Sequence, residues 1–302
     1  MVDKRSYPYF LGGVIICFFG AICFSTKAIF VKLAYRETHV DPVSLLALRM
    51  IFSLPFFIVS AWWTSSKSEN VRFTLKQWLA VAGIGCLGYY VSSLLDFLGL
   101  QYVTAGIERL ILFVYPTMVL VMSAFILKVK IKPIQWLAVL ITYIGLTIAF
   151  WGEVSFKNET TNFYLGVLLI FVCAVTYAIY IVGSGQLIPT IGAAKFNSYA
   201  MSFAALAVVL HFLVVNDNSL FNFEAQVYIY SFLMAIIGTV IPSYLVASGI
   251  KRVGSDNAAI IGSVGPVSTI IQASLFLQEP VHLLQLVGTT FILGGILMIS
   301  KK

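Results

Sequence analysis

Long apolar runs constrain this chain more than any other feature. The sequence holds ten of them, separated by short polar segments. A helix needs about 20 apolar residues to cross a bilayer, and its backbone groups have to be satisfied within the segment. The sequence therefore predicts an all-α integral membrane protein with ten transmembrane helices. The predicted spans are residues 10–35, 42–63, 77–101, 106–127, 133–151, 164–188, 197–215, 227–250, 257–277 and 282–300.

Composition agrees with this prediction. Hydrophobic residues make up 60% of the 302 residues and charged residues 10%, whereas a soluble domain carries about 25% charged residues. The mean hydropathy is +0.97. We therefore expect the lipid bilayer to surround most of the chain, with no sizeable soluble domain.

A weak internal repeat divides the chain into two copies, residues 1–152 and 163–302. Pro116 and Pro266 lie 150 positions apart in two of the apolar runs, and other identities share this offset. With five spans in each copy, an odd number, the second copy would lie upside down relative to the first. Inverted repeats are typical of alternating-access transporters, which bind substrates near the repeat interface. Further pairs with this offset are Gly88 with Gly238, Ser93 with Ser243, Gly99 with Gly249 and Gly145 with Gly295.

The basic residues indicate how the chain is oriented. With the N-terminus in the cytoplasm, most of them fall in cytoplasmic segments, and only Lys32, Arg36 and Lys157 fall at outer ends or loops. Cytoplasmic loops of membrane proteins carry an excess of lysine and arginine. Both termini are therefore predicted to be cytoplasmic. The same bias accounts for the net charge of +7 without a nucleic-acid partner.

Five ionisable residues fall inside the predicted spans. Lys27, Arg49, Asp96, Glu108 and Arg109 all belong to the first copy, and the helical rise places them roughly 3–12 Å below the outer surface. Ionisable residues in the bilayer are costly and are functional candidates by default. The second copy does not repeat them, although an architectural requirement would more naturally appear in both copies. We therefore take these five as candidates for handling a substrate or a proton.

Charge balance within this layer favours particular contacts. Buried charges need partners, so Asp96 is expected to pair with Lys27 or Arg49. Glu108 and Arg109 point in different directions around a helix, and each is expected to have another partner. One positive charge is left over, which could meet an anionic or carboxylate-bearing substrate, while Asp96 or Glu108 could load a proton. The alternatives are a static ion-pair lattice and, for Glu108 and Arg109, snorkelling towards the interface.

Polar and aromatic stripes near these charges are candidates for lining a cavity. Residues three, four and seven positions before Asp96 share its helix face, and a second stripe lies in the span 164–188. Stripes of this kind are also common where helices simply pack. Two residues beside the mid-span prolines complete the set. The candidates are Tyr89, Ser92, Ser93, Tyr115, Tyr177, Tyr180, Ser184 and Gly262.

Pro116 and Pro266 are expected to bend or break their helices at matching depths. Such kinks can serve packing alone. At corresponding positions of an inverted repeat they favour a hinge or a binding role.

The order of several short motifs resembles the drug/metabolite transporter superfamily, in its EamA-type ten-helix branch. The resemblance covers almost the whole chain. The sequence departs from it where Lys128-Val129-Lys130 replaces an expected glutamate after the fourth span. The motifs are Ser25-Thr26-Lys27, Leu46-Ala47-Leu48-Arg49, the prolines Pro116 and Pro266, and Leu277-Gln278-Glu279-Pro280.

The resemblance implies a carrier of the inner (plasma) membrane, often an exporter of amino acids, metabolites or drugs. It also implies a central cavity lined by the first, third, fourth, sixth, eighth and ninth spans. The last span of each half would be peripheral.

Together these features predict a secondary transporter that moves a small metabolite, an amino acid or a drug-like solute by alternating access. Export is the expected direction, and proton coupling is left open. The alternatives are a channel-like facilitator and, less favoured, a membrane sensor or enzyme. The sequence has no Walker A motif, zinc-ligand spacing or dinucleotide fingerprint, so we expect neither an enzyme nor a cofactor nor a metal site. The expected partners are the solute and the lipid bilayer, with protons left open as a third, and the chain would act as a monomer or a homodimer.

Overall fold

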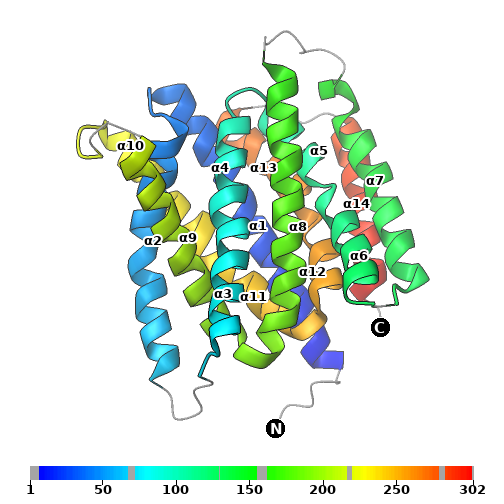
Figure 1. Cartoon of the computed structure of the whole chain (residues 1–302). Coiled ribbons are helices and arrows are strands. Elements are labelled where there is room, and N and C mark those ends of the chain that lie inside the picture. Colours follow the sequence, from blue (N-terminus) through cyan, green and yellow to red (C-terminus); the bar gives the residue numbers. More distant parts are fainter. Residues whose placement is uncertain are drawn as a thin grey trace.

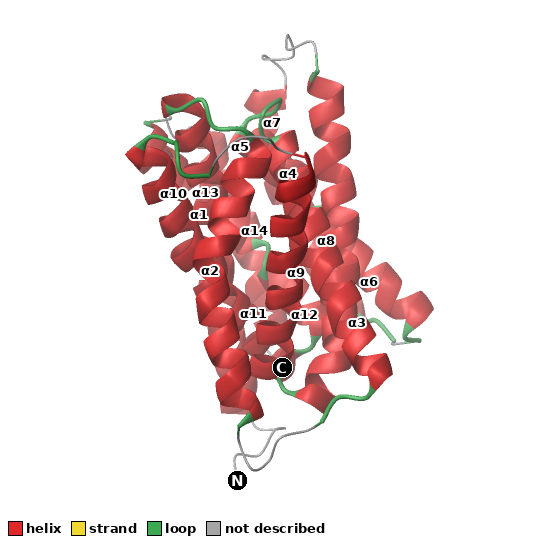
Figure 2. Cartoon of the chain, turned by 60° about the vertical axis from the view of Figure 1, so that its left-hand side comes forward, coloured by secondary structure: helices red, strands yellow, loops and turns green. Residues whose placement is uncertain are grey.

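The computed structural model describes residues 7–66, 72–128, 130–154, 162–215, 220–278 and 283–300. Within those ranges every regular element is a helix. The helices run roughly side by side, with α2 at one edge and α7 and α14 at the other (Figure 1). A view turned by 60° again shows only helices joined by short loops (Figure 2).

Local sequence signals set several helix ends. In α2 (Pro42–Ser65), the Asp41 side chain accepts hydrogen bonds from the backbone N–H groups of Val43 and Ser44, at 3.0 and 2.9 Å. Pro42 stands in the first turn, where its missing N–H costs no bond. The other α-helices are α1 (Tyr7–Glu37), α3 (Leu75–Gly85), α4 (Ser92–Gly99), α5 (Ala105–Leu112), α6 (Tyr115–Ile126), α7 (Pro133–Val154), α8 (Phe163–Ile191), α9 (Ala193–Val215), α10 (Ala225–Ala235), α11 (Ile241–Val253), α12 (Ser255–Ile261), α13 (Val264–Leu277) and α14 (Leu283–Ser300).

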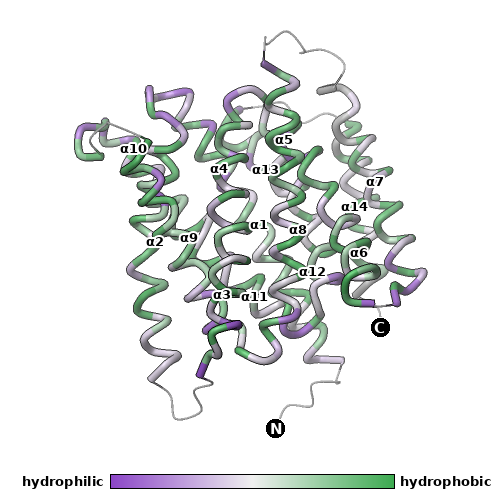
Figure 3. Tube along the Cα trace, viewed as in Figure 1, coloured by the Kyte–Doolittle hydropathy of each residue, from purple (hydrophilic) through white to green (hydrophobic). Residues whose placement is uncertain are grey.

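Seven helices or continuous helix runs are long and apolar enough to cross a membrane. Three shorter apolar helices accompany them, Tyr115–Ile126, Pro133–Ile148 and Leu286–Met298. Hydrophobic residues follow the helices, and many of the hydrophilic ones lie near their ends (Figure 3). The prediction of an all-helical membrane protein is therefore confirmed. The count of ten spanning helices and the inversion of the second copy stay predictions.

Pro116 and Pro266 each mark an interrupted helix. The first interruption separates α5 from α6 and the second separates α12 from α13. A proline ring clashes with the carbonyl four residues earlier and supplies no N–H to it. The helices accordingly break at 113–114 and at 262–263, just before the prolines. The hinge role of the two prolines stays a prediction.

Two π-helical turns interrupt other spans. The turn η1 (Cys86–Val91) joins α3 to α4, and η2 (Ile236–Val240) joins α10 to α11. They start 150 positions apart, the offset of the sequence repeat. Each turn widens the helix locally and shifts the faces of the residues that follow. In η2 the Thr239 hydroxyl donates to the Met234 carbonyl, five residues back, at 2.9 Å.

The connection between α8 and α9 is tighter than predicted. The predicted spans left residues 189–196 between them as a connection, whereas α8 continues through Pro189 to Ile191. Gly192 has a φ of 93°, a conformation that costs glycine little. A single residue therefore turns the chain, and α9 begins at Ala193.

Helices α7 and α14 pack closely against one another at one edge of the molecule (Figure 1). Small residues permit this approach. A Cβ added to Gly145 would lie 2.6 Å from the carbonyl oxygen of Gly288. Gly145 and Gly295 share the 150-residue offset, and an added Cβ on Gly295 would likewise meet Ala138 and Thr142. This pair of the repeat therefore corresponds to close helix packing.

Gly85 provides a direct test of the packing between α3 and α9. A Cβ at Gly85 would lie 2.8 Å from the Cα atom of Ala200, and backbone cannot move aside as a side chain can. We expect Gly85→Ala to lower the free energy of unfolding by about 1–3 kcal/mol. The matched control is Gly83→Ala in the same helix, where no atom of the described residues lies within 4 Å. It should be neutral or stabilising by up to about 1 kcal/mol.

Unfolding by SDS in bicelles measures both variants. Equal effects of the two substitutions would contradict the close approach of α3 and α9.

Candidate functional site

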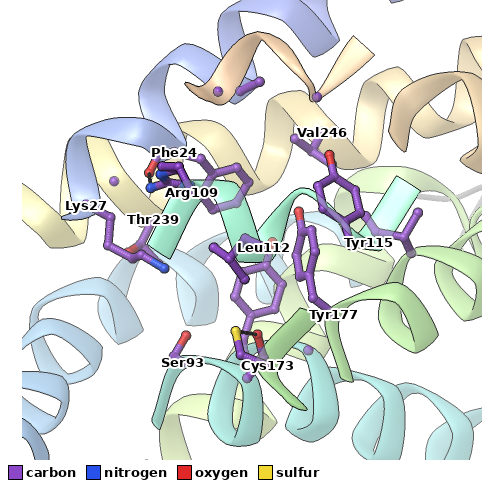
Figure 4. A pocket seen from close by; sticks show the side chains of 18 of the residues that line it. Phe24, Lys27, Ser93, Arg109, Leu112, Tyr115, Cys173, Tyr177, Thr239 and Val246 are labelled. Atoms are coloured by element: carbon purple, nitrogen blue, oxygen red, sulfur yellow. Dashed lines mark hydrogen bonds between the residues drawn. The ribbon is translucent and has the colours of Figure 1, made fainter. Parts of the chain in front are cut away.

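A central cavity of about 110 Å³ lies among the helices. Side chains from α1, α4, α5, α6, α8 and α11, together with the turns η1 and η2, face it (Figure 4). Arg49 of α2 and residues of α12 and α13 complete the lining. Segments from both halves of the chain therefore enclose one space. The set includes the spans implied by the family resemblance and adds α2.

Lys27 and Asp96 form an ion pair between α1 and α4. The distance between Lys27 Nζ and Asp96 Oδ2 is 2.6 Å. The Asp96 side chain is fully buried and that of Lys27 is 14% exposed. Of the two partners considered for Asp96, the structure therefore selects Lys27. Lys27 itself lines the cavity, and Asp96 lies behind it.

Glu108 and Arg109 pair with each other, with 3.0 Å between Arg109 Nε and Glu108 Oε2. The two residues were not expected to pair with each other, and that expectation was wrong. Arg109 does have a further partner, because its Nη2 atom donates to the carbonyl of Phe24 at 3.5 Å. The Arg109 side chain is long enough to fold back onto its neighbour, although the two Cβ atoms point in different directions. The carboxyl group of Glu108 also lies close enough to that of Asp96 for the two to interact electrostatically.

Lys27, Asp96, Glu108 and Arg109 thus form one buried group, which we call the charge cluster. Its two positive and two negative charges balance.

Arg49 is not part of the charge cluster. It is buried, with 2% of its surface exposed. Its Nη2 atom donates to Ser93 Oγ at 2.9 Å, and its guanidinium carbon lies 4.9 Å from the centre of the Phe97 ring. Its Nε atom has no hydrogen-bond partner among the described residues. None of the ion pairs within the described part of the chain includes Arg49. The sequence predicted three positive charges and two negative ones within the spans. Arg49 is therefore the positive charge that has no negative partner within the ranges that the structure describes.

Aromatic side chains form another part of the lining. Tyr115 and Tyr177 meet edge to face, with 5.3 Å between ring centres. The Tyr115 hydroxyl donates to the carbonyl of Ala259 at 2.9 Å, which links α6 to α12. In Figure 4, Lys27 and Arg109 lie to the left, whereas Tyr115 and Tyr177 lie to the right. The cavity thus has a charged side and an aromatic side.

The structure places the predicted lining residues unevenly. Tyr180 and Ser184 do not face the cavity. The Tyr180 ring fills the space over Gly88, where an added Cβ would overlap it, and the Ser184 hydroxyl donates to the Ile181 carbonyl of its own helix at 2.9 Å. Tyr180 and Ser184 therefore serve helix packing, which was the alternative to lining a cavity. At the cavity lie Tyr89, Ser92, Ser93, Tyr115, Tyr177, Gly262 and one of the two prolines, Pro266.

Several lining residues were not singled out from the sequence. Cys173 is one, and its thiol lies 3.3 Å from the Ser92 hydroxyl. Thr239 and Gly238 reach the cavity from η2. The pairing of Gly88 with Gly238 at the repeat offset was the available signal, because each glycine lies in a π-helical turn. The others include Cys17, Phe24, Leu112 and Val246.

Comparison with known proteins agrees with a membrane transporter. The profile of the EamA-like transporter family matches residues 11–151 and 164–301. The chain belongs to this family of membrane transporters, and it is a multi-pass membrane protein.

Two relatives from Bacillus subtilis are themselves named as transporters. The chain is 31% identical to the uncharacterized transporter YcbK of Bacillus subtilis (strain 168), over 95% of this chain and 91% of the relative. It is 26% identical to the uncharacterized transporter YetK of the same organism, over 100% of this chain and 94% of that protein. A solved structure described only as "Crystal structure of protein" matches with a TM-score of 0.77 at 17% identity, covering 96% of this chain and 98% of that one. This last likeness concerns the fold.

Proposed function

We propose that this protein is a secondary transporter that moves a small solute across the membrane by alternating access. The observation that carries the proposal is the central cavity, which holds buried charges and is enclosed by segments of both halves of the chain. Intramembrane charges that face a cavity are typical of substrate or ion pathways. Family membership supports the same conclusion.

The architecture proposed for this mechanism is ten transmembrane helices in two inverted repeats, residues 1–152 and 163–302. Two pairs of irregularities recur between the halves and support it. The π-helical turns η1 and η2 are one pair, and the breaks before Pro116 and Pro266 are the other. In this mechanism the two breaks act as hinges when the cavity changes the side to which it opens.

The proposed location is the inner membrane, with both termini in the cytoplasm. The first turn of α1 and the last turn of α14 lie at the same end of the molecule (Figure 1), in keeping with an even number of crossings. The distribution of lysine and arginine favours the cytoplasm for that end. One chain encloses the whole cavity, which suits a monomer or a homodimer of independent units.

The proposed solute is a small metabolite, an amino acid or a drug-like molecule, with export as the working direction. Proton coupling would use Asp96 or Glu108. Their carboxyl groups are buried and close together, and two adjacent carboxyls bind a single proton more readily than they bear two negative charges.

A channel-like facilitator is the competing proposal, since it too would need a central polar cavity. Counterflow in proteoliposomes separates the two, because a carrier exchanges solute across the membrane in saturable steps and an open pore does not. A membrane sensor or enzyme would show ligand binding without any protein-dependent flux.

A further inference from the structure

The cavity carries one uncompensated positive charge. The two ion pairs of the charge cluster neutralise Lys27 and Arg109. Arg49 lines the same cavity with 2% of its surface exposed and forms no ion pair within the described residues. A hydroxyl and an aromatic ring are its principal contacts. Removing a charge from water is costly unless a charge of opposite sign replaces the lost hydration. An anion in the cavity would provide that charge.

The geometry of the guanidinium indicates which anion would fit. It presents several N–H donors in a planar fork, a shape that matches a carboxylate with two parallel hydrogen bonds. One donor is held by Ser93, and the Nε donor is unpartnered among the described residues. The Ser93 hydroxyl lines the cavity beside it. A carboxylate could therefore accept from both Arg49 and Ser93.

The remainder of the lining suits an apolar body. Positions in the second copy that correspond to Asp96 and Glu108 at the 150-residue offset are Val246 and Ala258, and both face the cavity. At these two positions the first copy has carboxylate side chains, whereas the second copy has apolar ones. Tyr115 and Tyr177 add an aromatic surface on the side away from Lys27 and Arg109 (Figure 4).

We propose that the solute is a small monocarboxylate with an apolar body. Its carboxylate binds Arg49 and Ser93, and its body lies against Tyr115 and Tyr177. This inference rests on the proposed function, because it names the class of solute that the carrier moves. When Asp96 and Glu108 are both ionised, the three positive charges exceed the negative ones by one, so a solute with a single negative charge balances the cavity.

Four small probes separate the parts of this proposal. 3-Methylbutanoate carries both the carboxylate and the apolar body. 3-Methylbutanamide and 3-methylbutylamine keep the body with a neutral or a positive head, and acetate keeps only the head. Because a ligand that binds the native state raises its thermal stability, the shift in unfolding midpoint of the detergent-purified chain measures binding. We expect the largest shift with 3-methylbutanoate, a smaller one with acetate, and none with the amide or the amine.

Variants then locate the carboxylate. Arg49→Gln is expected to weaken 3-methylbutanoate binding about 10- to 100-fold, as the loss of a hydrogen bond between charged groups implies. The matched control is Arg252→Gln, which removes a guanidinium that is stacked 5.3 Å from the ring centre of Tyr9 and does not line the cavity. It should leave binding unchanged. Arg49→Lys keeps the charge without the fork and should bind with intermediate affinity.

Three results would overturn the inference: an equal or larger shift with the amine or the amide, an undiminished shift in Arg49→Gln, or no shift with any of the four probes. Each leaves the carrier proposal standing, because that proposal fails only when no solute shows counterflow.

Discussion

Replacing Lys27 with methionine is expected to lower the free energy of unfolding by about 3–5 kcal/mol. The substitution removes the partner of a carboxylate that has no surface exposed and that lies 2.6 Å from the lysine nitrogen. Asp96 would then be buried beside Glu108 with less positive charge to offset it. The double variant Lys27→Met/Asp96→Asn removes both charges, so it should recover a large part of the loss. Unfolding by SDS in bicelles gives the four free energies of this double-mutant cycle.

The exposed pair Arg36–Glu37 in the same helix α1 provides the control. Its atoms are 3.4 Å apart, and its side chains are 57% and 37% exposed. Water screens such a pair, so Arg36→Gln should change stability by less than about 1 kcal/mol. If the losses in Lys27→Met and Asp96→Asn simply added in the double variant, Lys27 and Asp96 would not stabilise the fold as a pair.

Glu108→Gln is expected to uncouple solute movement from a pH gradient. In the intact protein, one proton per transport cycle would support solute accumulation of up to about tenfold for each pH unit, because one unit corresponds to about 1.4 kcal/mol. A glutamine cannot take up that proton, so accumulation should fall to about the level seen without a gradient. Exchange of solute for solute should persist, since it requires no net proton movement. Uptake of a tracer into proteoliposomes, with and without the gradient, measures both quantities.

Glu224→Gln is the matched control for this experiment. Glu224 is an exposed residue just before α10, and its substitution should leave gradient-driven accumulation intact. Proton coupling through Glu108 is contradicted if the Glu108→Gln protein still accumulates solute when the gradient is imposed.

Helices with local signals were predictable from the sequence. Helix α2 starts at Pro42, the residue expected, and Pro116 and Pro266 break their helices where the chemistry of proline requires. The π-helical turns were not predictable in this way. No proline lies in or directly after η1, and an extra residue in a helical turn changes hydrogen bonding without changing apolar content. The only sequence signal for the two π-helical turns was the recurrence of glycine at Gly88 and Gly238.

The site shows a similar division. A common depth for the five ionisable residues followed from helix length and topology, and the structure brings four of them into the charge cluster, with Arg49 lining the same cavity. The pairing of Glu108 with Arg109 did not follow, because helical geometry fixes where Cβ points and leaves a long side chain free to return. Tyr180 was misplaced for a related reason. Tyr180 does share one face of α8 with Tyr177. However, because Gly88 has no side chain, the Tyr180 ring packs over it instead of facing the cavity.

The central claim is that the cavity exchanges solute across the membrane as a carrier, and counterflow tests it most directly. Proteoliposomes are loaded with a high concentration of unlabelled solute and diluted into buffer that contains a labelled trace of it. The solutes are 3-methylbutanoate and a panel of amino acids, other carboxylates and amines, with protein-free liposomes as the control. A carrier predicts that, for at least one solute, label rises transiently above its equilibrium level and that this rise saturates with concentration. Label that only approaches equilibrium for every solute, or that enters no faster than in protein-free liposomes, would contradict the claim.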